Sequence, residues 1–126
     1  MNLLLDTCAL LAVANGTLSA RAARAVRSAP EVFVSSVSAW EIAIKAASGK
    51  LTLQHPAAVW FESVLERHRI VEIPLDHGQA CEAAALPPLH RDPFDRVLVA
   101  LAYSRSLCLV TNDRIIPQYP NLETLW

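Results

Sequence analysis

Two aspartates lie at the start of a strongly apolar helix, which the sequence predicts from residue 93 to about Ser106. Asp92 and Asp95 lie in the stretch His-Arg-Asp-Pro-Phe-Asp-Arg-Val-Leu-Val-Ala-Leu-Ala at 90–102. Proline fits the first position of a helix, because the N–H that it lacks has no partner there, so Asp92 is predicted to be the N-cap. Asp95 then shares a face with core positions, where an unpaired carboxylate is costly. Two interpretations stay open: a capping arrangement in which Asp95 reaches back to Asp92, or a site that binds a cation.

Three further acids follow the apolar runs of the sequence. Asp6 comes directly after one run, Asp113 comes two residues after another, and Glu41 falls in the predicted first turn of a helix. Each has an ordinary explanation: Asp6 as a helix cap, Asp113 as a turn residue, and Glu41 either as the capping-box partner of Ser38 or as the partner of Lys45 in an exposed ion pair. Together these explanations weaken, because carboxylates about 4 Å apart repel by a few kcal/mol unless they bind cations or hold protons. Oxygen ligands without Cys or His favour a hard cation, Mg²⁺ or Mn²⁺.

Carboxylate-bound Mg²⁺ or Mn²⁺ suits the hydrolysis of a phosphodiester, because the metal can generate hydroxide and stabilise charge on the phosphate oxygens. Residues beside the acids suggest how a substrate would be held. Arg91, Arg96 and Arg114 are candidates for binding substrate phosphates, and Thr111 for orienting a metal-bound water. Surface arginines and a threonine at a strand end also occur without any such role.

Short apolar runs alternate with helical segments, and this order places the acids. Strands are predicted at 2–5, 32–35, 70–73 and 107–111, with an edge strand at 122–126. Helices are predicted at 7–13, after Ser19, from Ala39 with Ser38 as cap to about 48, at 56–68, at 76–86 and at 93–106. This alternation predicts an α/β fold with a mainly parallel sheet and helices on both faces. Ligands bind such sheets beyond the carboxyl ends of the strands. Four of the acids should point toward that edge: Asp6, Glu41, Asp95 and Asp113.

The bulk composition indicates a core-rich globular chain. Its 126 residues suit one domain, 1–126, and 53% of them are hydrophobic, with a mean hydropathy of +0.30. No apolar run approaches the roughly 20 residues of a membrane span, and Asp6 interrupts an apolar start that no basic residue precedes, so no export signal is expected. Three widely spaced cysteines predict neither disulfides nor a zinc site and fit the cytoplasm. The net charge of −1 gives no general attraction to nucleic acid.

Four blocks of the sequence resemble the PIN-domain ribonucleases. They are Leu-Leu-Leu-Asp-Thr at 3–7, Val-Ser-Ala-Trp-Glu-Ile-Ala-Ile-Lys at 37–45, Asp-Pro-Phe-Asp-Arg-Val-Leu-Val-Ala at 92–100 and Val-Thr-Asn-Asp at 110–113. The blocks span nearly the whole chain in order, and they look most like the VapC-type toxins of type II toxin-antitoxin pairs. Cys8 and Ala12 stand where the family more usually has His and Trp, a departure that concerns packing and not metal ligands.

The resemblance implies a Rossmann-like PIN domain with a mainly parallel sheet of four to five strands. It also implies dependence on Mg²⁺ or Mn²⁺, endonucleolytic cleavage of RNA, homodimerisation and inhibition by a cognate antitoxin. The metal-binding acids of the family correspond to Asp6, Glu41, Asp95 and Asp113 in this chain, with Asp92 of the same block as a further candidate.

Two other functions share parts of this pattern. Phosphoryl transfer to a strand-end aspartate would need a second acid near Asp6 or a lysine after the late strand, and neither is present. A PIN-like scaffold that binds RNA or protein without cleavage is the alternative to the nuclease, and Asp95→Asn would separate the two. Dimer and antitoxin surfaces would use apolar positions of the first helices that also fit the core, such as Leu10, Leu11, Trp40 and Trp60.

Overall fold

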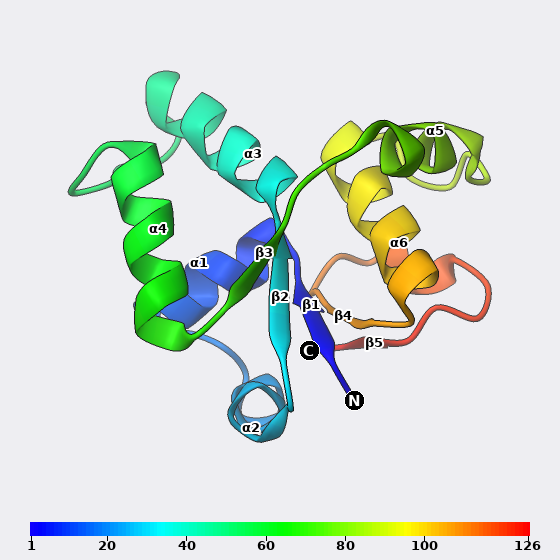
Figure 1. The fold of residues 1–126 in the computed structure, drawn as a ribbon, viewed down its shortest axis with the longest axis horizontal. Coiled ribbons are helices and arrows are strands. Elements are labelled where there is room, and N and C mark those ends of the chain that lie inside the picture. The colour runs from blue at the N-terminus through cyan, green and yellow to red at the C-terminus, as the bar shows by residue number, and fades with distance from the viewer.

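A five-stranded sheet in the middle of the molecule carries six α-helices and a short 3-10 helix, η1 (Figure 1). The computed structural model describes residues 1–126. The strands are β1 (Leu3–Leu5), β2 (Val32–Ser35), β3 (Val71–Ile73), β4 (Cys108–Val110) and β5 (Thr124–Leu125). The helices are α1 (Thr7–Asn15), α2 (Ala20–Ser28), α3 (Ser36–Ala47), α4 (Ala57–His68), α5 (His77–Ala85), α6 (Pro93–Arg105) and η1 (Ile116–Gln118). None of these helices combines the length and the apolar character needed to cross a membrane.

All neighbouring strands run parallel, in the order β3-β2-β1-β4-β5. In this register Leu4 of β1 lies opposite Phe33 of β2 and Leu109 of β4. The chain leaves β1 toward β2 and β3 on one side and returns to β4 and β5 on the other, so the winding reverses at β1. Ligands of parallel sheets bind beyond the carboxyl ends of the strands at such a reversal. The predicted fold, a parallel sheet of four to five strands with helices on both faces, is confirmed.

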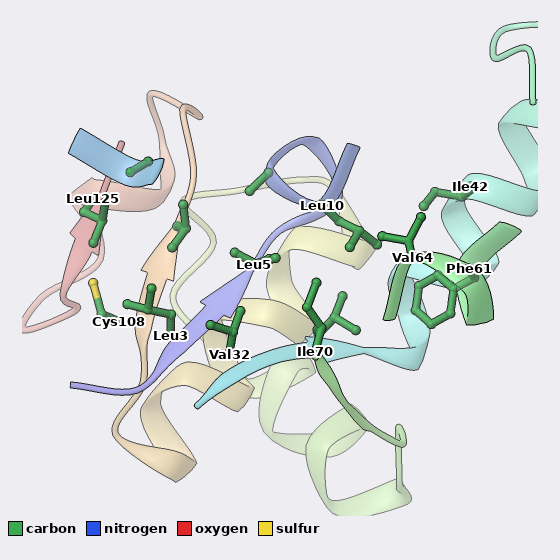
Figure 2. Close-up of a cluster of buried hydrophobic side chains, with 14 residues drawn as sticks. Leu3, Leu5, Leu10, Val32, Ile42, Phe61, Val64, Ile70, Cys108 and Leu125 are labelled. Carbon is green, nitrogen blue, oxygen red and sulfur yellow. The ribbon is translucent and has the colours of Figure 1, made fainter. Parts of the chain in front are cut away.

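Two hydrophobic clusters cover the two faces of the sheet. Leu3 and Leu5 belong to one cluster and Leu4 to the other, as the period of two along a strand requires. The first cluster packs α1, α2 and α4 against the sheet, and Figure 2 shows Phe61 of α4 beside Ile42 of α3 at one end of it. The second cluster holds α5, α6 and η1 on the opposite face. Helix α6 is buried along six consecutive residues, 97–102, and is therefore a rigid support for the acids at its start.

Helix α3 begins three residues earlier than predicted. Ser35, the last residue of β2, is its N-cap, and the Ser35 hydroxyl accepts a hydrogen bond from the N–H of Val37 at 3.1 Å. Ser38, the predicted cap, lies inside the helix and is fully buried. Three of the four residues from 35 to 38 are serines suited to capping, and the end of the strand selects the first of them. Glu41 consequently lies in the second turn of α3 and not in the first.

The other boundaries agree with the predictions to within about two residues. Asp6, Ser19 and Asp76 cap α1, α2 and α5 through their side chains. Gly16 ends α1 with a φ of 69°, a left-handed conformation that glycine adopts without strain. The predicted edge strand is present as β5 beside β4, whereas η1 was not predicted.

Candidate metal centre

Acidic side chains from four segments of the chain meet in one cavity beyond the carboxyl ends of β1 and β4. The cavity has a volume of about 150 Å³ and is lined by Asp6, Thr7, Cys8, Glu41, Lys45, Asp92, Asp95, Asn112 and Asp113. Asp6 follows β1, Asp113 follows β4, and Asp95 lies in the first turn of α6. The structure thus brings together the four acids that the sequence singled out, and it places Asp92 with them.

Three of the aspartates also accept hydrogen bonds from backbone N–H groups that follow them in the chain. The hydrogen bonds run to Asp6 from the N–H of Ala9 (2.7 Å), to Asp92 from Phe94 (2.9 Å), and to Asp113 from Ile115 (2.7 Å) and Ile116 (3.0 Å). Each aspartate uses its Oδ1 for this purpose, which leaves Oδ2 for other partners. The capping explanation and the site explanation therefore hold at the same time, because one carboxylate has two oxygens.

Glu41 is held by side chains from two helices. The hydroxyl of Thr7, at the start of α1, donates to Oε1 of Glu41 at 2.6 Å and lies 3.0 Å from the hydroxyl oxygen of Ser38. Lys45, one turn further along α3, pairs with Oε2 at 2.8 Å, and this hydrogen bond raises the pKa of Lys45. Glu41 is only 8% exposed. The predicted ion pair exists, but it lies at the cavity and not on a solvated face.

His90 is the residue of this centre that sequence reasoning missed. Its Nε2 lies 3.2 Å from Oδ2 of Asp95 and 3.1 Å from Oδ2 of Asp113, and its Nδ1 accepts a hydrogen bond from the N–H of Asp92 at 3.1 Å. The imidazole, and not the Asp95 side chain, thus takes the N–H of the capping residue, so of the two open interpretations the reach of Asp95 back to Asp92 is not observed, although Asp92 does cap α6. The available signal was its place two residues before the cap of α6, in the same sequence block as Asp92 and Asp95.

Burial and mutual repulsion change the protonation of these acids. Burial raises the pKa of Asp95 to about 7, and repulsion from Asp92 adds to this effect, while His90 acts in the opposite direction. Burial also raises the pKa of Asp6, against hydrogen bonds from the Thr111 side chain and the N–H of Ala9. For Asp113 burial acts to raise the pKa, but hydrogen bonds from His90 and from the backbone outweigh it and lower the pKa. Carboxyl groups whose ionised forms are unfavourable in the protein alone gain stability from a nearby cation.

The donor set fits a hard divalent cation. The cavity offers carboxylate oxygens from five acids together with the side chain of Asn112, and Mg²⁺ and Mn²⁺ prefer such oxygen ligands. Candidate ligand atoms of His90, Asp95 and Asp113 all lie within 4.8 Å of one another. Cys8 lines the cavity, but burial and the charge of Asp6 raise the pKa of its thiol, and metals bind the thiolate.

Arg96, a predicted phosphate ligand, is engaged inside the fold. Its guanidinium donates at 2.8 to 3.4 Å to carbonyl oxygens at the end of α5 and in the following loop, those of Ala83, Ala84, Leu86, Pro87 and His90. A planar cation with several donors suits a group of carbonyls at the C-terminus of a helix. Because its donors join α5 to α6, the expectation that Arg96 holds substrate is not supported.

The other predicted substrate residues differ in position. Arg91 is exposed and lines a hollow of about 490 Å³, which shares Glu41, Lys45 and Asp92 with the acidic cavity. Arg114 is exposed and lines neither of the two. Thr111 is buried, and its hydroxyl accepts from the N–H of Asp113 at 3.0 Å and hydrogen-bonds Asp6. Thr111 therefore holds two of the acids in place.

The apolar positions considered for partner surfaces differ in how exposed they are and in what they contact. Leu10 is fully buried and belongs to the core, so it offers no surface. Trp40 is 59% exposed and stacks edge to face against Phe94, with ring centroids 5.2 Å apart. Leu11 and Trp60 line a groove of about 600 Å³ between α1 and α4, away from the acids.

Comparisons with known proteins identify the family of this chain. Residues 3–122 match the model of the PIN domain family. Ribonuclease VapC22 of Mycobacterium tuberculosis is 33% identical over 112 residues, which cover 86% of this chain and 85% of that protein.

Solved structures share the fold at low identity. VapBC2 from Rickettsia felis, bound to a DNA fragment from its promoter, has a TM-score of 0.72 at 16% identity and covers 99% of this chain and 98% of its own. FitAcB from Neisseria gonorrhoeae has a TM-score of 0.67 at 20% identity, covering 100% of this chain and 97% of its own. The match to the family model over residues 3–122, together with the identity to ribonuclease VapC22 and the parallel sheet, establishes that the chain belongs to the PIN-domain family.

Proposed function

We propose that this protein is an endoribonuclease that depends on Mg²⁺ or Mn²⁺ and acts as the toxin of a toxin-antitoxin pair. The observation that carries the proposal is the convergence of Asp6, Glu41, Asp95 and Asp113 on one cavity, where burial and repulsion raise the pKa of Asp95 to about 7. Such a cluster is unfavourable without a cation. The 33% identity to a VapC ribonuclease over most of the chain supports the same substrate class.

In this proposal the four acids hold the metal, with Asp92 at the edge of the same cavity. A bound Mg²⁺ or Mn²⁺ would polarise the phosphodiester and lower the pKa of a water. The residues around the acids keep the carboxylates oriented: Thr7 holds Glu41, and Thr111 holds Asp6 and the N–H of Asp113. Lys45 lies in the lining of both the cavity and the adjoining hollow, where its ammonium can contact a phosphate as well as Glu41.

The adjoining hollow is the path that we assign to the RNA strand. Its lining carries Lys45, Lys50 and Arg91 together with the ring of Phe94, which combines cations for phosphates with an aromatic surface for a base. The net charge of the chain is −1, so attraction of RNA has to come from a local group of this kind. We expect Lys50→Ala and Arg91→Ala to weaken RNA binding, and Arg114→Ala, outside the hollow, to leave it unchanged.

The partners in this proposal are a cognate antitoxin and a second copy of the chain. Structural neighbours solved as toxin-antitoxin complexes support the former. The exposed side chains of Trp40 and Ile44 on α3 offer apolar area for the latter. The cytoplasm is the proposed compartment, because Cys8, Cys81 and Cys108 are free thiols.

Cleavage of total RNA by the purified full chain, freed of any partner, tests the activity. Reactions contain Mg²⁺, Mn²⁺ or EDTA and compare the protein with Asp6→Asn, Asp95→Asn and, as a matched control outside the site, Glu82→Gln on the exposed face of α5. We expect metal-dependent cuts that disappear in both aspartate variants and persist in the control. Cuts that survive EDTA and both substitutions would refute the carboxylate mechanism, and a folded protein that cuts no RNA would favour the scaffold.

A further inference from the structure

The imidazole of His90 contacts two of the acids that line the cavity, although His90 is not part of the lining itself. His90 is 9% exposed. Its Nε2 lies at hydrogen-bond distance from Oδ2 of Asp95 and Oδ2 of Asp113, 3.2 and 3.1 Å away. These two acids come from different segments, the start of α6 and the loop after β4, and His90 is the side chain that contacts both of them. Its role is decided by which ring nitrogen carries the hydrogen.

The backbone decides this question. The N–H of Asp92 points at Nδ1 of His90 with a nitrogen-to-nitrogen distance of 3.1 Å. A nitrogen that accepts a hydrogen bond presents its lone pair and carries no hydrogen, so the hydrogen of the neutral ring lies on Nε2. In that tautomer Nε2 donates to Oδ2 of Asp113, while Oδ2 of Asp95 lies 3.2 Å away in electrostatic contact. A metal ligand needs a lone pair at the nitrogen that faces the metal, and Nε2 has none to offer.

We propose that His90 is a positioning residue that donates a hydrogen bond from Nε2 to Asp113 and lies in ion-pair contact with Asp95, holding both acids toward the cavity, and that it is not itself a metal ligand. The inference rests on the proposed metal site and adds a residue to it. Outer partners of ligating carboxylates orient those ligands, and their loss commonly weakens metal binding about 10- to 100-fold. The remaining ligand set is then all oxygen.

The backbone of His90 is held as well, at both its N–H and its carbonyl group. Its N–H donates to the hydroxyl of Tyr119 at 3.1 Å, and its carbonyl accepts from Arg96 at 3.2 Å. Tyr119 is 2% exposed, and its hydroxyl lies 3.4 Å from the carbonyl oxygen of Pro87. These contacts anchor the peptide of His90 between η1 and α6. Arg96 therefore has a second role, because its guanidinium holds the backbone of the residue that contacts the two acids.

Two substitutions separate the donor role from a purely structural one. In His90→Asn the shorter side chain keeps an oxygen near the place of Nδ1, where it can accept the N–H of Asp92, but it cannot reach the carboxylates. In His90→Gln the longer side chain brings an amide N–H to the place of Nε2. Calorimetric titration with Mn²⁺ should give affinity about 10- to 100-fold weaker for the Asn variant and within about threefold of the native value for the Gln variant. Circular dichroism and thermal unfolding show whether both variants are folded.

Heteronuclear NMR of the ring nitrogens tests the tautomer directly in the metal-free protein, with the His90→Gln spectrum identifying the signals of His90. We expect a hydrogen on Nε2 alone. A hydrogen on Nδ1, or on both nitrogens, would overturn the proposal, and so would nitrogen coupling from a directly bound imidazole in pulsed EPR of the Mn²⁺-loaded protein. Equal Mn²⁺ affinity in the two folded variants would also overturn it. These readouts need no RNA, so they fail or succeed separately from the nuclease activity.

Discussion

Replacement of Asp95 by Asn should stabilise the metal-free protein, and more so as the pH rises. Burial and repulsion from Asp92 raise the pKa of Asp95 from 3.8 to about 7 in the folded state. Between these values the folded chain binds a proton that the unfolded chain has released. The free energy of unfolding therefore falls as the pH rises from about 4 to about 7. Asn imitates the protonated form at every pH, so Asp95→Asn escapes this loss.

The size of the effect follows from the difference between the two pKa values. Each pH unit of difference corresponds to about 1.4 kcal/mol, so the ionised Asp95 costs about 4 kcal/mol in the folded state. Its side chain is 18% exposed, which leaves little screening by water. The advantage of Asp95→Asn should grow from about 1.5 kcal/mol at pH 5 to about 4 kcal/mol at pH 8.

Urea unfolding in EDTA, at pH 5 and at pH 8, measures this difference. EDTA is needed because a bound cation would stabilise the native protein and hide the effect. Glu82→Gln, at an exposed position of α5, is the control and should change the free energy of unfolding by less than about 0.5 kcal/mol at either pH. An advantage of Asp95→Asn that is the same at both pH values, or a loss of stability at pH 8, would refute the reasoning. Added Mn²⁺ should stabilise the native protein and not the variant.

Two other substitutions test contacts around the centre, and a third tests the C-terminal end of α6. Arg96→Ala leaves carbonyls at the end of α5 without their cation and should lower the free energy of unfolding by about 2 to 4 kcal/mol in urea, whereas Arg91→Ala should change it by less than about 0.5 kcal/mol. Thr7→Val removes the hydroxyl bonded to Glu41 and should weaken Mn²⁺ binding about tenfold in calorimetry, with Thr7→Ser close to native. Ser106→Gly relieves a φ of 53° at the end of α6 and should raise thermal stability by about 0.5 to 1 kcal/mol.

The elements and the convergence of the acids could be predicted from the sequence because both depend on local signals. Apolar runs bounded by Asp6 and by Pro30 mark buried strands, and a proline after Asp92 marks the start of α6. Parallel topology then brings strand ends and helix starts to one edge. The start of α3 was misplaced because neighbouring serines satisfy the same capping rule, and Ser35 serves both as the last residue of the strand and as the cap of the helix.

The roles of His90 and Arg96 could not be predicted because they depend on segments that meet only in the folded chain. His90 contacts Asp113, 23 residues away. The carbonyl groups that accept hydrogen bonds from Arg96 are free only because α5 ends there. The sequence around Arg96 does not show that this helix end lies beside it in the folded chain. Asp6 and Asp92 could be interpreted as caps and Asp113 as a turn residue because those interpretations describe Oδ1 correctly and say nothing of Oδ2.

Because β2 passes directly into α3, the number of residues at this junction determines where Glu41 lies relative to the other acids. Ser35 ends the strand and caps the helix, so no linker separates the sheet from the turn that carries Glu41. Successive residues of a helix are rotated by about 100° around its axis. One residue gained or lost between 35 and 41 would carry Glu41 away from Thr7 and out of the cavity, while the sheet stayed intact. The connection at 48–56 has no such constraint, so natural variation in length within this part of the chain should collect there.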